Sequence, residues 1–334
     1  MNKKALISGI TGQDGSYLAE YLLSLNYIVI GLHRRSSGYN FDRISHIIDH
    51  PNFRLEELDL VDGSNCSSII QSHKPDEFYN LAAQSHVATS FNQPTNTFMV
   101  NTTGVINILE SIKTYSPATK FYQASTSEMF GYNFSINDLG KKYQDENTAF
   151  MPQSPYGSSK LAAHNIVRIY RSGYGIFGCC GILFNHESPR RGENFVTRKI
   201  TKYIGQIKNN LIDKNIKLKL GNLSAQRDWG HAQDYVIAMH KMLQVDRPDD
   251  YVICTGQTWS VQEFLYTAFN LAGLDPSDYV EIDPNLYRPA EVEYLKGSYA
   301  KAKSFLGWEP KVSFSELVKD MVENDVKKFQ RSRI

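Results

Sequence analysis

Short apolar runs alternate with longer amphipathic stretches through the first two-thirds of this chain. Buried strands are predicted at six apolar runs, residues 5–10, 28–32, 54–58, 77–81, 120–123 and 177–183. Helices are predicted between them, at residues 15–25, 64–72, 95–115 and 156–174. Because uninterrupted apolar strands between helices are typical of a parallel sheet covered on both faces, the pattern predicts a doubly wound α/β fold of the Rossmann type. Ligands of such a sheet bind at the carboxyl ends of its strands.

The rhythm changes near residue 185, where a polar stretch rich in Arg, Pro and Glu begins. Further helices are predicted at residues 196–208, 261–272, 299–306 and 314–329, whereas residues 231–243 and 252–255 are predicted to return to the main sheet. At roughly 150 residues per domain, a chain of 334 residues has room for two domains. We expect a larger domain of residues 1–184 plus about 229–258, and a smaller C-terminal α/β substrate-binding domain of about 185–228 plus 259–334.

Composition excludes several classes of protein. Lys and Arg number 36 against 35 Asp and Glu, so the formal net charge of +1 gives no reason to expect a nucleic acid or a membrane surface as partner. No apolar run approaches the roughly 20 residues of a membrane span. The four cysteines form no CxxC pair, and we expect neither a disulfide framework nor a metal site. The expected location is the cytoplasm.

Gly9, Gly12 and Gly15 lie between the first predicted strand and the first predicted helix. Glycine lets the backbone turn sharply and approach a pyrophosphate, whose charge then meets the N-terminus of the helix. A glycine triplet alone is weak evidence, but a strand before it and a helix after it make a simple tight turn the poorer interpretation. The sequence therefore predicts a dinucleotide-binding loop, with a G-x-x-G-x-x-G spacing similar to that of short-chain dehydrogenases/reductases.

The end of the second predicted strand distinguishes NADP from NAD. NAD sites usually carry an acidic residue there for the ribose hydroxyls, but this chain has Arg34, Arg35 and Ser36. Guanidinium and hydroxyl groups suit a 2′-phosphate through charge-assisted hydrogen bonds, so we expect NADP, the alternative being a solvated basic loop. The ends of the third and fourth strands supply further residues expected beside the cofactor: Asp59, Leu60, Leu81, Ala82 and Ala83.

Tyr156 and Lys160 form a Y-x-x-x-K pattern on a predicted helix, where i, i+4 spacing places both side chains on one face. A free tyrosine has a pKa of about 10, and a nearby Lys⁺ with a cationic nicotinamide ring is expected to favour the tyrosinate. Thr126 follows another predicted strand and can hydrogen-bond a sugar oxygen. Glu128 offers an additional acid/base, which is needed to remove a proton from carbon and help a hydroxyl leave. The alternative for Glu128 is a solvent-facing loop carboxylate.

Longer stretches then carry a clear resemblance to a known family. They are residues 125–128 (STSE), 181–192 (GILFNHESPRRG), 195–200 (FVTRKI), 220–223 (LGNL), 227–231 (RDWGH) and 288–292 (RPAEV). On these residues the chain resembles the GDP-mannose 4,6-dehydratase family, within the extended short-chain dehydrogenases/reductases. The resemblance runs from Gly9 to the last predicted helix. It implies an NADP-dependent hydro-lyase that converts a GDP-sugar into its 4-keto-6-deoxy form.

The resemblance implies a role for each matched residue. Tyr156, supported by Lys160, takes the proton from O4 of the sugar while the C4 hydride passes to NADP⁺, and Thr126 hydrogen-bonds O4. Glu128 removes the C5 proton and helps water leave from C6, after which the hydride returns to C6. Further cofactor-binding residues implied by the match are Thr11, Gln13, Asp14, Leu183, His186 and Arg191.

The resemblance also implies a GDP-sugar site. A nucleotide diphosphate needs cations, and guanidinium groups bind phosphates in bidentate fashion. The cations within the matched stretches are Arg191, Lys199, Arg227 and Arg288. The other implied substrate contacts are Ser85, Asn185, Val196, Leu220, Gly221 and Glu291. Structural salt bridges are the alternative for the charged residues. The resemblance further implies a homodimer or homotetramer in which Arg35 contacts a neighbouring subunit beside the cofactor.

Two departures from the family pattern concern the sugar. Residues 131–150 form a longer segment than expected, and because it begins soon after Glu128 it could cover the pocket. The family more often has aromatic residues at positions 162 and 164, where this chain has Ala162 and His164. Smaller or more polar side chains would leave room for a larger sugar, so one hypothesis is a GDP-manno-heptose substrate. The alternative is a change on a helix face that lies away from the pocket.

Other activities on this fold are alternatives. A nucleotide-sugar epimerase or 4-reductase would keep the glycine loop, Tyr156 and Lys160, but would not require Glu128. A non-catalytic NADP-sensing protein is a third alternative. Such proteins often lack the Tyr or the Lys, and this chain has both.

Overall fold

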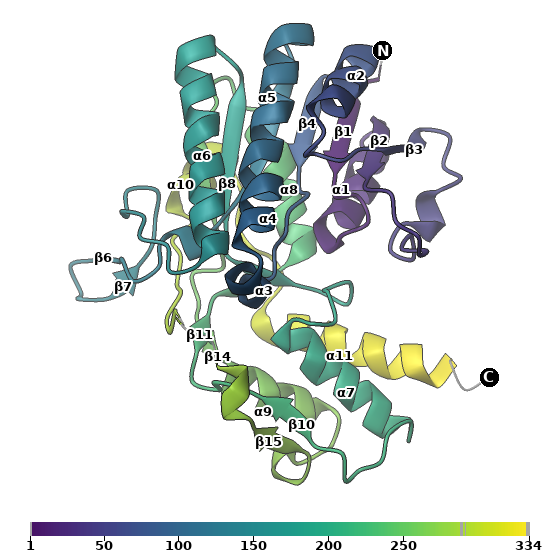
Figure 1. Cartoon of the computed structure of the whole chain (residues 1–334). Helices are drawn as coiled ribbons and strands as arrows, with labels where there is room; N and C mark the ends of the chain where they lie inside the picture. Colours follow the sequence, from purple (N-terminus) through teal and green to yellow (C-terminus); the bar gives the residue numbers. More distant parts are fainter. Residues whose placement is uncertain (1, 288–289, 291, 332–334) are drawn as a thin grey trace.

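A central sheet of seven parallel strands is formed within the described part of the chain, which is residues 2–287, 290 and 292–331 of a computed structural model (Figure 1). In spatial order the strands are β13 (Asp250–Ile253), β8 (Gly178–Leu183), β5 (Lys120–Thr126), β4 (Glu77–Asn80), β1 (Lys4–Ser8), β2 (Ile28–His33) and β3 (Phe53–Glu57). The chain runs outward from β1 to β3 and then returns to the other side of β1 with β4. This reversal places a ligand-binding crevice between β1 and β4, and the predicted fold class is confirmed.

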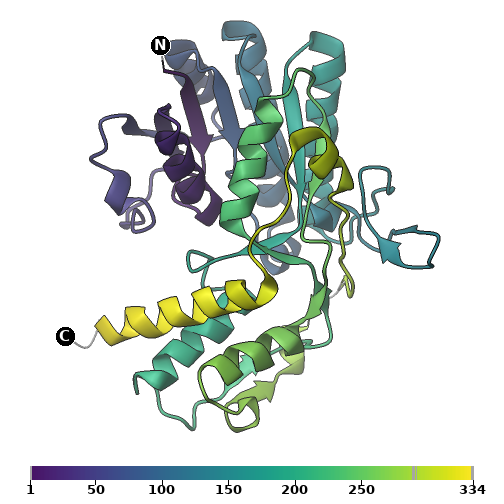
Figure 2. The ribbon, with the colours of Figure 1, turned by 180° about the vertical axis from the view of Figure 1, so that it is seen from behind.

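Helices cover both faces of the sheet. One face carries α2 (Gly63–His73), α5 (Gly104–Tyr115) and α6 (Pro155–Tyr174), which lie in front in Figure 1. The opposite face carries α1 (Gln13–Ser24), α8 (Ala232–Leu243) and α10 (Ala300–Leu306), and α8 comes to the front in Figure 2. Successive strand residues point to opposite faces, so Leu6 packs in the core under α2, α5 and α6, whereas Ile7 packs under α1 and α8.

A second, smaller group of elements lies beyond the carboxyl ends of the strands (Figure 1). Its helices are α7 (Val196–Lys208), α9 (Val261–Leu271) and α11 (Phe314–Arg331). Short strand pairs join β10 (Leu218–Leu220) to β15 (Val280–Ile282) and β11 (Gln226–Arg227) to β14 (Trp259–Ser260). Its own apolar core includes Trp259 stacked on Phe314, with ring centroids 4.4 Å apart. Helix α10, although predicted within this part, packs on α8 and β13 of the larger one.

The long helix predicted at residues 95–115 is interrupted. The structure has α3 (Val87–Asn92), α4 (Pro94–Phe98), a π-helical turn (Met99–Thr103) and then α5. Asn101 in the π-helical turn accepts a hydrogen bond from the backbone N–H of Gln84 at 2.9 Å and donates to the Gln84 carbonyl at 3.1 Å and to Ser159 Oγ at 3.0 Å. The turn therefore anchors the loop that follows β4, which is consistent with the frequent use of π turns at functional sites.

Residues 131–150 contain a small hairpin of β6 (Ser135–Ile136) and β7 (Lys142–Tyr143). The hairpin stands out at the side of the molecule, beside the N-terminal end of α6 (Figure 1). No helix among the described residues is long and apolar enough to cross a membrane.

A buried ion pair joins two helices of the smaller group. Arg198 on α7 donates to Asp325 on α11, and their side chains are 3% and 0% exposed. Thr201 Oγ1 also donates to the Asp325 carboxylate, at 2.7 Å. Burial raises the pKa of Asp325 even though the guanidinium opposes that shift. Each buried charge is therefore stabilised only while its partner is present.

Asp325→Ala should lower the free energy of unfolding by about 3 kcal/mol, because it leaves a buried guanidinium without its carboxylate. Glu323→Ala is the matched control, since Glu323 is an exposed carboxylate on the same helix and should change stability by less than about 0.5 kcal/mol. Chemical denaturation followed by the fluorescence of Trp229 and Trp259, which lie in the same core, measures both variants. Equal effects of the two substitutions would contradict this account.

Candidate active site

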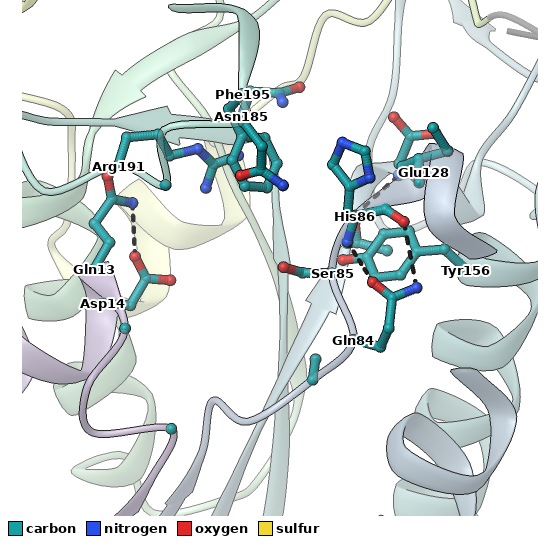
Figure 3. Close-up of a pocket in the computed structure, with 18 of the residues that line it drawn as sticks. Gln13, Asp14, Gln84, Ser85, His86, Glu128, Tyr156, Asn185, Arg191 and Phe195 are labelled. Atoms are coloured by element: carbon teal, nitrogen blue, oxygen red, sulfur yellow. Dashed lines mark hydrogen bonds between the residues drawn. The ribbon is translucent and has the colours of Figure 1, made fainter. Parts of the chain in front are cut away.

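A cavity of about 1170 Å³ lies between the carboxyl ends of the sheet strands and the smaller group of elements. In the close-up, Gln13 and Asp14 lie on one side of it and His86, Glu128 and Tyr156 on the other (Figure 3). The cavity brings together all four predicted catalytic residues. It is lined by every predicted cofactor-binding residue except Arg35, which is exposed outside it. The described substrate-binding residues also line it; Arg288 and Glu291 lie outside the described residues.

The glycine loop is packed so tightly that side chains do not fit in it. Gly9 has a φ of +71°, and a Cβ there would lie 2.8 Å from the backbone nitrogen of Ala82. A Cβ at Gly15 would lie 2.4 Å from the Gly9 carbonyl oxygen. Gly12 caps α1 without a side-chain hydrogen bond, so the N-terminus of the helix is available for an anion. This geometry fits the pyrophosphate of a dinucleotide.

The segment that follows β2 contributes basic and hydroxyl side chains to the cavity lining. Arg34 and Ser36 lie there as predicted, together with Arg43, which sequence reasoning missed. Arg43 donates to the Thr11 carbonyl at 3.2 Å and to the Arg190 carbonyl at 2.8 Å, so its guanidinium is fixed beside the glycine loop. No motif marks Arg43, because only the path of the chain after β2 brings it back to this loop.

Asp14 and His186 form an ion pair in the wall of the cavity, with 2.8 Å between Oδ2 and Nε2. Burial opposes ionisation of Asp14, but the pair with His186 outweighs it and lowers the pKa of the carboxyl group. In the same way, burial disfavours the imidazolium, but Asp14 outweighs it and raises the pKa of His186. Gln13 Nε2 donates to Asp14 Oδ1 at 2.9 Å and so fixes the carboxylate (Figure 3). The pair ties α1 to β9 (Asn185–Glu187).

The four predicted catalytic residues come from β5, from the short 3₁₀ turn that follows it (Ser127–Met129) and from α6. Thr126 ends β5, and its Oγ1 accepts a hydrogen bond from the backbone N–H of Glu128 at 3.3 Å, in the turn that follows. Tyr156 lies in the first turn of α6, after Ser154 caps the helix through its hydroxyl. Lys160 follows one turn later and donates to the Ala124 carbonyl of β5 at 2.8 Å. The end of β5 and the start of α6 therefore converge on one point of the cavity.

Burial controls the protonation of this group. It raises the pKa of Tyr156 to about 12, although a hydrogen bond with Thr126 lowers it. It lowers the pKa of Lys160 to about 8. The expected lowering of the tyrosine pKa is thus absent in the protein alone, because loss of hydration outweighs the neighbouring charges. Tyr156 is a phenol that can donate a hydrogen bond until a ligand changes its surroundings.

The loop after β4 contributes residues that sequence reasoning missed. Gln84 and His86 line the cavity on either side of the predicted Ser85 (Figure 3). Gln84 Oε1 accepts a hydrogen bond from the His86 backbone N–H at 2.7 Å. The signal that could have found them is the polar run directly after the apolar fourth strand.

The predicted substrate side is preorganised by contacts among its charged groups. Arg191 lies 3.1 Å from Glu187 Oε2, and its guanidinium lies 3.7 Å from the centre of the Phe195 ring. Glu187 is 2% exposed and also accepts a hydrogen bond from Thr197 at 2.5 Å. Lys199 projects from α7 into the same lining. Arg191 and Lys199 therefore form a basic wall of the cavity, with the Phe195 ring packed against the Arg191 guanidinium.

The two departures from the family pattern do not reach the cavity. Residues 131–150 contribute nothing to its lining, and neither do Ala162 and His164. His164 is buried behind the site, where Ser125 Oγ lies 3.1 Å from its Nδ1. The expectation that these positions enlarge or cover the sugar pocket is therefore wrong, because residues 131–150 form a hairpin outside the cavity lining and His164 is buried behind the site.

The pKa of Lys160 predicts a pH effect on stability. Between pH 8 and the ordinary lysine value of 10.5, the unfolded chain keeps a proton that the folded chain has released, so raising the pH favours folding. Relative to Lys160→Met, the wild-type chain should gain about 2 kcal/mol of unfolding free energy between pH 7 and pH 10. Denaturant unfolding at several pH values measures this. Lys319→Met, at an exposed lysine, is the control and should show the same pH dependence as the wild-type chain. If the wild-type chain gained as much stability relative to Lys319→Met, the effect would not arise from Lys160.

Comparisons with known proteins agree with this geometry. Residues 6–321 match the family model of GDP-mannose 4,6 dehydratase. The chain is 51% identical over 342 residues to GDP-mannose 4,6 dehydratase 2 of Arabidopsis thaliana, covering 99% of this chain and 89% of that protein.

Two solved structures share the fold. The dTDP-glucose 4,6-dehydratase of Bacillus anthracis, in complex with NAD, gives a TM-score of 0.83 at 24% identity and covers 98% of both chains. The protein RMD of Pseudomonas aeruginosa, complexed with NADPH, gives 0.79 at 21% and covers 98% of this chain and 100% of that one. By its sequence along nearly the whole length, the chain belongs to the GDP-mannose 4,6-dehydratase family.

Proposed function

We propose that this chain is a hydro-lyase that converts GDP-mannose into its 4-keto-6-deoxy product. The observation that carries the proposal is the convergence of Thr126, Glu128, Tyr156 and Lys160 on one cavity that also contains a dinucleotide loop. Tyr156 and Lys160 alone would serve a reductase or an epimerase. Glu128 adds a carboxylate close enough to influence the pKa of Tyr156, and dehydration requires such an acid/base.

The first task of the chain is to hold and deprotonate O4 of the sugar. Thr126 and Tyr156 offer two hydroxyl groups at the end of β5, and we assign the O4 proton to Tyr156. Lys160, anchored on the Ala124 carbonyl, stabilises the tyrosinate as it forms. When bound, a nicotinamide dinucleotide held by the glycine loop would supply the redox chemistry, as acceptor and then donor of the hydride of the sugar.

The second task is the loss of water. The ketone at C4 acidifies the proton on C5, and Glu128 removes that proton. The C6–O bond then breaks, and Glu128 returns the proton to the departing hydroxyl, which leaves as water. Hydride at C6 and a proton at C5 complete the product, so the sugar loses one water and the cofactor is unchanged overall. Glu128 is half-buried, which suits a group that must both bind and release a proton.

We propose NADP as the cofactor, in preference to NAD. Arg34, Ser36 and the fixed guanidinium of Arg43 gather at the end of the cavity where an adenosine ribose would lie after β2. Positive charge and a hydroxyl suit a 2′-phosphate better than the bare hydroxyls of NAD. The related structures in complex with NAD and with NADPH show that the fold accommodates either one.

For the GDP-sugar we propose the basic wall formed by Arg191 and Lys199. Arg191, Lys199 and Arg227 would neutralise the diphosphate. Asn185 and Val196 line the same wall and would contact the sugar–phosphate and the guanine. GDP-mannose is the simplest substrate, since the features that suggested a heptose lie outside the cavity. We also propose a homodimer or homotetramer in which the exposed Arg35 reaches a neighbouring subunit.

Glu128→Gln should lower the rate of water loss from GDP-mannose by at least about 100-fold, because the amide cannot take the C5 proton. Mass spectrometry of the nucleotide sugar, without added NADPH, follows the loss of one water. Gln has nearly the same size, so binding of GDP-mannose should change little. Unchanged dehydration by the variant would remove Glu128 from this role.

Two further assays of the wild-type chain distinguish the alternatives. A new epimer in the proton NMR spectrum of the product would identify an epimerase, and net consumption of NADPH added to the reaction would identify a reductase. Either result would overturn the proposed function.

Arg34→Ala should weaken NADPH binding by about 10-fold while leaving NADH binding unchanged, because it removes a charge-assisted contact with the 2′-phosphate. Fluorescence titration with each nucleotide measures this. Lys214→Ala, at an exposed residue away from the cavity, is the control. Equal losses for the two nucleotides would contradict NADP selection.

Arg35→Ala tests the proposed contact across subunits, and it is expected to change NADPH affinity or the mass of the oligomer. If neither NADPH affinity nor oligomer mass changed, the contact would be excluded.

A further inference from the structure

Three polar side chains from three elements meet behind the catalytic group. They are Ser125 on β5, His164 on α6 and Asp250 on β13. Ser125 Oγ lies 3.1 Å from His164 Nδ1, and His164 Nε2 lies 3.6 Å from Asp250 Oδ2. The His164 side chain is 2% exposed. The arrangement is a serine–histidine–aspartate chain buried inside the fold, and only Ser125 reaches the lining of the cavity.

The surroundings of His164 determine its charge and tautomer. Asp250 is held by Arg171, with 2.5 Å between Oδ1 and Nη2, and Arg168 lies 3.8 Å away. Burial lowers the pKa of His164 to about 4, although Asp250 opposes the shift, so the ring is neutral near pH 7. Attraction to the Asp250 carboxylate, 3.6 Å from Nε2, favours the tautomer that carries its single proton on Nε2. Nδ1 is then an acceptor, and the hydroxyl of Ser125 donates to it.

The same surroundings argue against a metal ion at this place. His164, Asp250 and Cys180 offer three ligand atoms within 4.8 Å of one another. The Asp250 carboxylate, however, is already paired with the Arg171 guanidinium, and a cation added beside that guanidinium would be repelled. The cluster is better explained as a serine–histidine hydrogen bond beside a carboxylate–guanidinium pair than as a metal site.

His164 stands on the same face of α6 as the catalytic pair. Tyr156, Lys160 and His164 are spaced four residues apart, so they lie one above the other along the helix. Lys160 donates to the Ala124 carbonyl, and His164 contacts the next residue of β5, Ser125. The residue after that is the catalytic Thr126. Two successive residues of β5 are thus each held by one residue of this helix face.

We propose that His164 is a positioning residue: its Nδ1 accepts the Ser125 hydroxyl and so holds the end of β5 against α6, which sets Thr126 beside Tyr156 where the sugar binds. The proposal rests on the proposed function. Helix α6 is packed on the sheet through apolar residues such as Ala163 and Val167, and His164 adds a polar contact at Ser125, the residue directly before Thr126. Misplacement of a catalytic group by about 1 Å can reduce a rate by about 100-fold. Loss of the buried contact between His164 and Ser125 can therefore lower the rate measurably.

Two variants of His164 test the proposal by kinetics. His164→Phe keeps the ring shape but removes the acceptor, and should lower kcat for GDP-mannose by about 10-fold with little change in KM. His164→Asn places an amide oxygen near the position of Nδ1 and should restore most of the kcat. Combining His164→Phe with Ser125→Ala should lower kcat no further than Ser125→Ala alone, because both act through one hydrogen bond. Wild-type kcat in His164→Phe, failure of Asn to rescue it, or additive losses would overturn the proposal.

Nitrogen NMR of histidine-labelled protein tests the hydrogen bond without relying on activity. The His164 signals are identified by their absence in His164→Phe. We expect the proton on Nε2 and a bare Nδ1 whose resonance shifts in Ser125→Ala, and a proton on Nδ1 would overturn the proposal. If the wild-type chain released no water from GDP-mannose, the proposed function would fall and with it the positioning role of His164, whereas a protonated Nδ1 in an active enzyme would refute the inference alone.

Discussion

A buried hydrogen-bond chain crosses the carboxyl ends of β1, β4 and β5, and the site depends on it. Ser8 Oγ accepts from the first two backbone N–H groups after β4 and donates to Asn80 Oδ1 at 2.6 Å. Asn80 Nδ2 donates to Gln123 Oε1 at 2.9 Å, and Gln123 Nε2 donates to the Ala124 carbonyl at 3.1 Å. That carbonyl also accepts the Lys160 ammonium. The strand that leads into the glycine loop is thereby connected to the catalytic lysine through polar groups that must be satisfied where water is excluded.

The parts of the site that could be predicted from sequence are those whose chemistry is local. The close approach of Gly12 and Gly15 to the Gly9 carbonyl lies within one turn, and the spacing of Tyr156 and Lys160 reflects one helical period. Thr126 and Glu128 were predictable because a strand end places neighbouring residues at the same edge of the sheet. Each of these inferences needs only the period of an element and the identity of the residues on it, and the sheet order observed here brings them to one cavity.

The parts that could not be predicted depend on contacts between residues far apart in the chain. Arg43 reaches the glycine loop through the Thr11 carbonyl, and Asn101 bends its helix to bind the loop at Gln84. Neither residue lies in a motif. The hairpin in residues 131–150 shows the converse, since nearness to Glu128 in sequence does not determine the direction in which a loop leaves the sheet. For the same reason, the sequence suggests that His164 enlarges the sugar pocket, whereas the structure shows its ring in contact with Ser125 behind the site.

Burial of the catalytic group links its chemistry to ligand binding. Removing water stabilises the neutral forms of both Tyr156 and Lys160, which raises one pKa and lowers the other. A tyrosine held as a phenol does not act as a base in the protein alone. A cationic ring bound beside it would favour the tyrosinate through a Coulomb interaction that the same exclusion of water strengthens. The Coulomb interaction between the cationic ring and the Tyr156 tyrosinate depends on the distance between them. Hydrogen bonds from α6 to Ala124 and Ser125 help to keep that distance fixed.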